Sequence, residues 1–107
     1  MMQKDSDIIP YGYVYKVTFP NGKIYVGRDT AATAEYDYYK YMGSPIGKAK
    51  VLMHNEIRHL LNERKTLTLI KELLYEARDC TVGHIKSKER EFIKITGSKN
   101  RDVGYNF

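Results

Sequence analysis

The sequence predicts an α+β domain whose elements follow the order strand, strand, helix, strand, helix. Two runs of β-favouring residues flank a break at residues 20–22 (Pro-Asn-Gly), and a shorter alternating segment follows later in the chain. In two further segments, apolar residues recur at intervals of three and four, which is typical of helices with one buried face. No internal repeat or low-complexity tract divides the chain, so we expect a single domain over residues 11–107.

The first part of the chain predicts a hairpin that follows a flexible leader. Residues 1–10 mix polar and apolar types without a period and stop at a proline, which predicts the leader. β-Favouring residues fill 12–19 and resume at 23–27 after the Pro-Asn-Gly turn. Residues 29–43 carry four tyrosines without a sustained apolar period, so we expect an excursion or a short helix there.

The second part predicts two helices with a strand between them. Ser44 and Pro45 suit the N-cap and first position of a helix that runs to about Arg64. Residues 66–76 begin with strict alternation and predict the third strand, and Gly97 is a plausible stop for the last helix. The expected buried residues of the first helix are Ile46, Ala49, Met53, Ile57, Leu60 and Leu61, and those of the last are Ile85, Phe92, Ile93 and Thr96.

Composition limits the class of protein. The chain has 107 residues, of which 42% are apolar, enough for one modest core. Cys80 is the single cysteine, which excludes an internal disulfide and a thiolate metal cluster. No stretch approaches the roughly 20 apolar residues that span a bilayer. We therefore expect an intracellular protein without a membrane partner.

The charge of the chain is unevenly distributed. The net charge is +5. Residues 1–43 hold five Lys/Arg and five Asp/Glu, whereas residues 44–107 hold thirteen against eight. This asymmetry suits an anionic partner, with nucleic acid first, although a basic protein without such a partner fits the composition equally well.

Two features of the predicted helices indicate possible chemistry. Lys50, His54 and Arg58 are four residues apart and form a basic row, which is either functional or simply a solvated face. Glu89 lies three residues before Phe92 and so within the inward stripe of the last helix. A buried carboxylate is costly without a cation or metal as its partner, so Glu89 is a functional candidate, unless it is a boundary residue that reaches water.

The hairpin carries a recognisable pair of motifs. Residues 13–15 (Tyr-Val-Tyr) and 25–27 (Tyr-Val-Gly) resemble the two motifs that name the GIY-YIG nuclease family. Tyr15 ends the first motif and Tyr25 begins the second. Tyr13 stands where that name has its first glycine. Residues 43–45 (Gly-Ser-Pro) resemble the Gly-Ser-Gly of a phage and homing-type subgroup.

Two later segments extend the resemblance to nearly the whole chain. Glu89 followed by Phe92-Ile93-Lys94 looks like the family's metal-ligand helix, and Gly104-Tyr105-Asn106 looks like its closing asparagine motif. The matches run in order from about Gly12 to Asn106. Four motifs in the right order are far more specific than one tyrosine pair.

The resemblance implies a three-stranded antiparallel sheet flanked by helices and a divalent-metal-dependent DNA endonuclease. Glu89 would bind one Mg²⁺ or Mn²⁺, and the metal would polarise the scissile phosphate and stabilise the leaving oxyanion. Tyr15, Tyr25 or both would lie beside the attacking water, and Asn106 would complete the site. A phenol can act as a base near neutrality only with a nearby cation or metal. Outside this motif context, both tyrosines would be ordinary strand residues.

One departure from the family concerns the phosphate-contacting arginine of its first helix. The alignment puts Lys50 at that position, with His54 four residues on, and no arginine occurs between Arg28 and Arg58. Lysine lacks the bidentate fork of arginine. Either activity is reduced, or Arg28 or Arg58 substitutes.

The expected partner is DNA, held mainly through its phosphate backbone, in a bacterium or a phage-infected host. Homing-type members of the family attach this domain to a separate DNA-reading domain. The resemblance therefore implies such a domain as a further partner. An inactive nucleic-acid-binding module with the same fold, favoured by Lys50, and a protein-interaction domain are the alternatives. The residues expected to contact DNA are Arg28, Lys48, Arg58, Lys86, Lys88 and Arg90.

Overall fold

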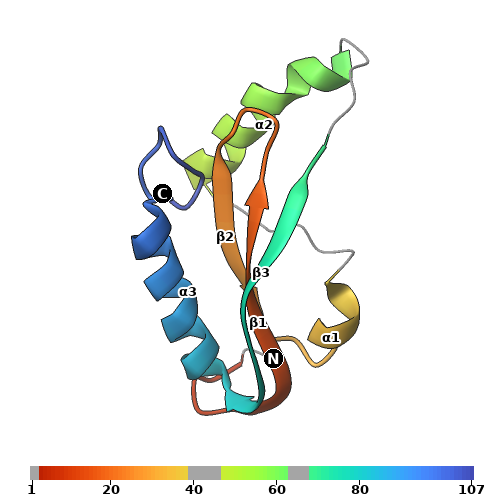
Figure 1. Ribbon diagram of the computed structural model, residues 1–107, viewed down its shortest axis with the longest axis vertical. Coiled ribbons are helices and arrows are strands. Elements are labelled where there is room, and N and C mark those ends of the chain that lie inside the picture. Colours follow the sequence, from red (N-terminus) through yellow and green to blue (C-terminus); the bar gives the residue numbers. More distant parts are fainter. Residues whose placement is uncertain (1–2, 39–46, 63–67) are drawn as a thin grey trace.

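The computed structural model describes residues 3–38, 47–62 and 68–107. The predicted order of strands and helices is confirmed, and the tyrosine-rich segment contains a four-residue helix, one of the two alternatives expected there (Figure 1). The elements are β1 (Ile8–Thr18), β2 (Ile24–Asp29), α1 (Ala34–Asp37), α2 (Gly47–Asn62), β3 (Ile70–Thr81) and α3 (Val82–Thr96).

The three strands form one antiparallel sheet in the order β2-β1-β3. The hairpin between β1 and β2 closes where the Phe19 backbone N–H donates to the Lys23 carbonyl at 2.9 Å. Gly22 occupies a positive φ of 83° in this turn, which favours glycine. The sheet confirms the predicted α+β class with three antiparallel strands and helices packed on them.

Side chains of β1 alternate between two cores on opposite faces of the sheet. Tyr13, Tyr15 and Val17 pack with α1 and α2, whereas Val14 packs with Val26 and α3. Figure 1 shows α3 along one side of the sheet and α1 on the other, with α2 crossing the upper ends of the strands. The buried members of the first core are Tyr13, Tyr15, Val17, Phe19, Ala34, Ala49, Met53 and Tyr105, and those of the second are Ile9, Val14, Val26, Val82 and Ile85.

Two predicted boundaries are wrong. β1 begins at Ile8 and not near Tyr11, because Ile8 and Ile9 extend the strand against Thr81 and Cys80 of β3. β3 covers 70–81 in place of 66–76, and residues 63–67 lie outside the described part of the chain. The strict alternation on which the prediction relied lies in residues 66–69 of the sequence, before the first residue of β3. A register shift at Val14/Tyr15 also interrupts the pairing of β1 with β3.

Both ends of α3 agree with their capping chemistry. Gly97 adopts φ 70° and its backbone N–H donates to the Ile93 carbonyl, which confirms the predicted stop of α3. At the other end of α3, the Thr81 side chain accepts from the His84 backbone N–H at 3.2 Å. The predicted start of α2 at Ser44 and Pro45 lies outside the described residues. In the described ranges, no helix is both long and apolar enough to cross a membrane.

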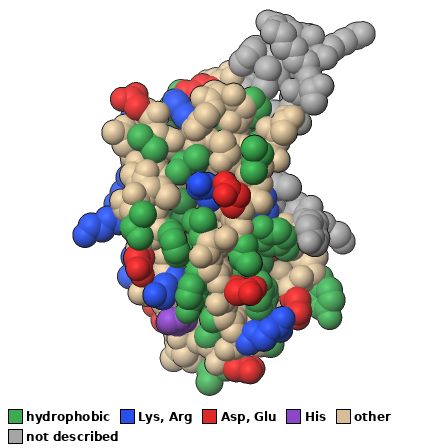
Figure 2. All heavy atoms as spheres, in the orientation of Figure 1, with side chains coloured by type: hydrophobic (Ala, Val, Ile, Leu, Met, Phe, Trp, Pro, Cys, Tyr) green, Lys and Arg blue, Asp and Glu red, His purple; other side chains and the backbone are tan. Residues whose placement is uncertain are grey.

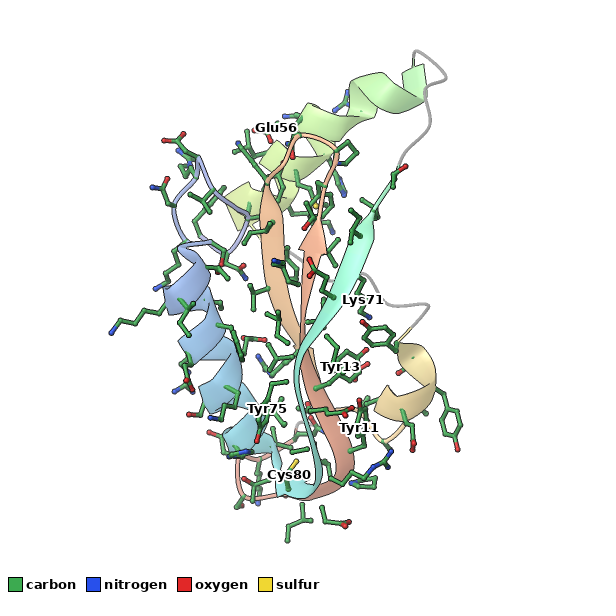
Figure 3. All side chains as sticks on the ribbon, in the orientation of Figure 1. Tyr11, Tyr13, Glu56, Lys71, Tyr75 and Cys80 are labelled. Atoms are coloured by element: carbon green, nitrogen blue, oxygen red, sulfur yellow. The ribbon has the colours of Figure 1, made fainter. Side chains whose placement is uncertain are left out.

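Glu56 ties α2 to the hairpin turn and the C-terminal tail (Figure 3). Its carboxylate accepts hydrogen bonds from Lys23 Nζ and Asn21 Nδ2, each at 2.8 Å, and from the Tyr105 hydroxyl. The hydrogen bond from Lys23, followed by that from Tyr105, holds the pKa of Glu56 below its usual value. The ionised form of Glu56 therefore stabilises the fold.

We expect the free energy of unfolding to decrease on acidification partly through Glu56. Because its pKa is lower in the folded state, its contribution is present above the unfolded value of about 4.3 and is lost as pH falls through the folded pKa. Urea unfolding of Glu56→Gln between pH 3 and 7 should show a weaker dependence on pH than the wild type. Glu91→Gln is the control, and equal profiles for the wild type and Glu56→Gln would contradict this role.

Candidate functional site

Glu89 lies on the face of α3 that is directed at the sheet. Its side chain is 17% exposed, against 54% for Glu91, as the spacing predicts. Ile85, one turn earlier, is fully buried in the core between α3 and the sheet. The Glu89 carboxylate accepts from Arg28 Nη1 of β2 at 3.1 and 3.3 Å. The structure therefore brings together a predicted metal ligand and a predicted DNA-binding arginine.

Burial and three neighbouring cations act in opposite directions on the pKa of Glu89. Burial raises the pKa of this carboxyl group above its usual value, while Arg28, Arg90 and Lys86 act in the opposite direction. Burial outweighs the cations, so the folded chain lacks enough positive charge at this point to compensate fully for the lost hydration. Such a carboxylate is suited to a further cation.

Asp5 is a second carboxylate beside the same cations. Its Oδ1 accepts from Lys86 Nζ at 2.7 Å, and this contact, with smaller effects of Arg90 and Arg28, lowers the pKa of Asp5. The contact between Asp5 and Lys86 could not be predicted from the sequence, because Asp5 lies in an aperiodic segment predicted to be a flexible leader. We call Asp5, Arg28, Lys86, Glu89 and Arg90 the charged cluster.

Tyr15 and Tyr25 lie on the opposite face of the sheet from the charged cluster. Their ring centroids are 6.5 Å apart, and both pack with the core below α1 and α2. Arg28 pairs across the strands with Val14, whose side chain belongs to the core under α3. The structure therefore brings the two tyrosines together but separates them from Glu89 by the sheet.

Lys71 supplies a cation on the tyrosine face (Figure 3). Its Nζ lies 4.4, 4.5 and 5.1 Å from the ring centroids of Tyr38, Tyr15 and Tyr13, respectively. It donates to the Tyr38 carbonyl at 2.6 Å and to the Tyr13 hydroxyl at 3.3 Å. Burial lowers the pKa of Lys71, partly offset by Asp29. Sequence reasoning missed this cation because only the pairing of β3 with β1 brings Lys71 to the tyrosines.

Asn106 fixes the C-terminal tail to the outer edge of β2. Its Oδ1 accepts from the Val26 backbone N–H at 2.8 Å, and its Nδ2 donates to the Val26 carbonyl at 2.7 Å. Just before it, the Tyr105 backbone N–H donates to the Ile24 carbonyl at 2.9 Å. Both polar atoms of the carboxamide thus bind the backbone of Val26, which lies two residues before Arg28 in β2. Asn106 is therefore suited to fix the position of the strand that carries Arg28.

Asn106→Ala should lower the free energy of unfolding by about 1–2 kcal/mol, because it removes both bonds to a partly buried strand edge. Urea unfolding measures this loss, and hydrogen exchange at Val26 should accelerate. In Asn106→Asp the acceptor for the Val26 N–H remains while the donor is lost, so an intermediate effect is expected. Equal stability of the wild type and Asn106→Ala would contradict the positioning role.

The basic row of α2 lies away from the charged cluster. Lys50, His54 and Arg58 are exposed on α2, which packs on the tyrosine face, and Arg58 donates to Asn55 at 2.9 Å. The side chain of Lys48 lies outside the described part of the chain. Predicted cations are also present on α3, where Lys88 contacts Glu91 at 3.4 Å and Arg90 is exposed. Figure 2 shows Lys and Arg side chains along the side of the molecule that α3 occupies.

The charged cluster offers few ligands for a metal. Within the described ranges, no group of three or more His, Cys, Asp or Glu side chains could hold a metal ion. Mg²⁺ is commonly held by one or two carboxylates together with waters and substrate phosphates. A half-buried Glu89, with cations nearby that suit phosphate, fits this donor set.

Comparisons with known proteins give no significant match for this chain, whether with protein-family models, curated proteins or solved structures.

Proposed function

We propose that this domain is an intracellular, divalent-metal-dependent endonuclease that hydrolyses DNA phosphodiester bonds, of the GIY-YIG type that its motifs resemble. The observation that carries the proposal is the half-buried Glu89 carboxylate in contact with Arg28 and in the field of Lys86 and Arg90. Metal-dependent hydrolysis of a phosphodiester needs a carboxylate that binds a hard cation and neighbouring cationic side chains that bind the phosphate.

In this proposal Glu89 would hold Mg²⁺ or Mn²⁺. When bound, the ion would supply Lewis-acid polarisation of the phosphate and stabilisation of the leaving oxygen. Arg28, which lies beside Glu89, would contact the scissile phosphate with its bidentate fork. Of the two arginines that could replace the missing helix arginine, Arg28 is favoured because Arg58 lies on the far side of the sheet.

Neither tyrosine lies beside the proposed metal. Tyr15 is fully buried and packs over Gly27, where an added Cβ would overlap its hydroxyl group, so we assign it a positioning role. Tyr25 is partly exposed but lies on the opposite face of the sheet from Glu89, so we do not assign it the water-orienting role at a metal held by Glu89.

A second candidate function is nucleic-acid binding without hydrolysis. The separation of Tyr25 from Glu89 by the sheet favours it, because a base and a metal must meet at one phosphate. Lys50 favours it as well, since it offers charge without a bidentate fork. In this reading the same cations bind phosphates, and Glu89 only pairs with Arg28.

Nicking of supercoiled plasmid in Mg²⁺, in Mn²⁺ and in EDTA distinguishes the two candidates. The nuclease predicts metal-dependent nicking that EDTA stops. Fluorescence anisotropy with a labelled duplex, measured in EDTA, reports binding separately. Intact plasmid in every lane together with salt-sensitive binding would establish the binding module, and the absence of both would reject both candidates.

A further inference from the structure

The N-terminal segment places the Asp5 carboxylate in an ion pair with Lys86 of α3. Asp5 Oδ1 lies 2.7 Å from Lys86 Nζ, and the Asp5 side chain is 63% exposed. Arg28 and Arg90 act on the same carboxylate at longer range. One exposed anionic group of the chain itself is thus paired with Lys86 and attracted by two further cations of β2 and α3.

The Asp5 carboxylate can leave Lys86 without releasing the segment that carries it. The Gly83 backbone N–H donates to the Asp5 carbonyl and the Val82 backbone N–H donates to the Asp7 carbonyl, each at 2.9 Å. These two bonds hold the segment on the first turn of α3 and do not involve the Asp5 side chain. Exposed ion pairs contribute little to stability, so a DNA backbone, whose successive phosphates attract all the cations of this surface, can displace the carboxylate.

We propose that Lys86, flanked by Arg28 and Arg90, is a binding site for one backbone phosphate of nucleic acid, and that the Asp5 carboxylate occupies this site in the free protein. This inference takes its partner from the proposed function and does not depend on hydrolysis. A phosphate oxygen would replace Asp5 Oδ1 on Lys86 Nζ, and the Asp5 side chain would turn to solvent. Asp5 therefore lowers the affinity for DNA and reduces its dependence on salt.

Asp5→Asn tests this competition, measured as duplex binding by fluorescence anisotropy in EDTA between 50 and about 200 mM salt. We expect the variant to bind about three- to fivefold more tightly at low salt, the modest gain expected when one exposed ion pair no longer competes. Lys86 is then free to exchange a counterion for a phosphate, so the slope of log K against log salt should steepen by about 0.9. Asp5→Ser, which also lacks the carboxylate, should give the same gain.

Asp7→Asn is the matched control. It lies in the same segment and changes the net charge equally, but its carboxylate accepts from the Lys4 backbone N–H at 2.9 Å and not from Lys86. We expect its affinity to change less than twofold, and Lys86→Gln added to Asp5→Asn should abolish the gain. Equal affinities for Asp5→Asn and Asp7→Asn, or a gain that survives Lys86→Gln, would overturn the inference.

These outcomes are separable from the fate of the proposed nuclease. A gain for Asp5→Asn in a protein that never nicks plasmid would support the phosphate site and reject the nuclease. Metal-dependent nicking with equal affinities for the two variants would do the reverse. Absence of DNA binding by the wild type and all variants would overturn the inference together with its nucleic-acid partner.

Discussion

Glu89→Gln is expected to lower the rate of metal-dependent plasmid nicking at least about a hundredfold, because a neutral carboxamide cannot balance the charge of a divalent ion. Nicking is measured as the conversion of supercoiled to open-circular plasmid in Mg²⁺ and in Mn²⁺. Glu91→Gln removes the same charge two residues away, on the exposed face of α3, and should retain activity within about threefold. Wild-type rates in Glu89→Gln would show that the metal is held elsewhere.

The loss of activity in Glu89→Gln should not come from unfolding. Burial raises the pKa of Glu89 despite Arg28, so the metal-free fold disfavours the charged form. Replacing it by a neutral group of equal size should leave the free energy of unfolding in EDTA unchanged or higher. Arg28 loses its partner, but its side chain is 35% exposed and can be hydrated. A variant that is both inactive and clearly destabilised would make Glu89 a structural residue.

Gly27→Ala is expected to have the largest effect on stability, a loss of about 2–4 kcal/mol. A Cβ at this position would overlap the hydroxyl group of Tyr15 and lie 3.0 Å from Cε1 of Tyr25. Tyr15 is fully buried and cannot move aside without disturbing the core below α1 and α2. Urea unfolding at neutral pH measures the loss. Adding Tyr15→Phe to Gly27→Ala removes the overlapping oxygen and should recover part of it.

Gly22→Ala separates this steric effect from the backbone effect of losing a glycine. At Gly22 an added Cβ has no atom of the described residues within 4 Å, but φ is +83°, so the cost is conformational strain of about 1 kcal/mol. Gly27→Ala should therefore be clearly more destabilising than Gly22→Ala. Similar losses for the two variants, or no recovery with Tyr15→Phe, would contradict the packing of Tyr15 over Gly27.

The elements that could be predicted from the sequence are those whose pattern is local. The Pro-Asn-Gly turn identified the hairpin, and the apolar spacing around Ile85 identified α3 with its stop at Gly97. The bounds of β1 and β3 were wrong because both depend on their mutual pairing: Ile8 and Ile9 become strand residues only against Cys80 and Thr81. No local pattern in the first ten residues carries that information.

In the candidate site, too, only the features with a local sequence pattern could be predicted. Spacing alone placed Glu89 inward, but its contact with Arg28 depends on how α3 crosses β2, which no periodicity records. The sequence does show that Tyr25 and Arg28 lie on opposite faces of the sheet. They are three residues apart in one strand, and side chains separated by an odd number of residues point to opposite faces. That count alone separates Tyr25 from any site built around Arg28.

The most direct test of the proposed function locates the metal. Mn²⁺ is titrated into ¹⁵N-labelled protein bound to a short phosphorothioate duplex, and the loss of amide signals is followed by NMR. A metal at Glu89 predicts that the signals of Arg28, Glu89 and Arg90 disappear first and that Glu89→Gln abolishes this selectivity. Signals lost first around His54 of α2, or uniformly along the chain, would contradict a metal-dependent nuclease centred on Glu89.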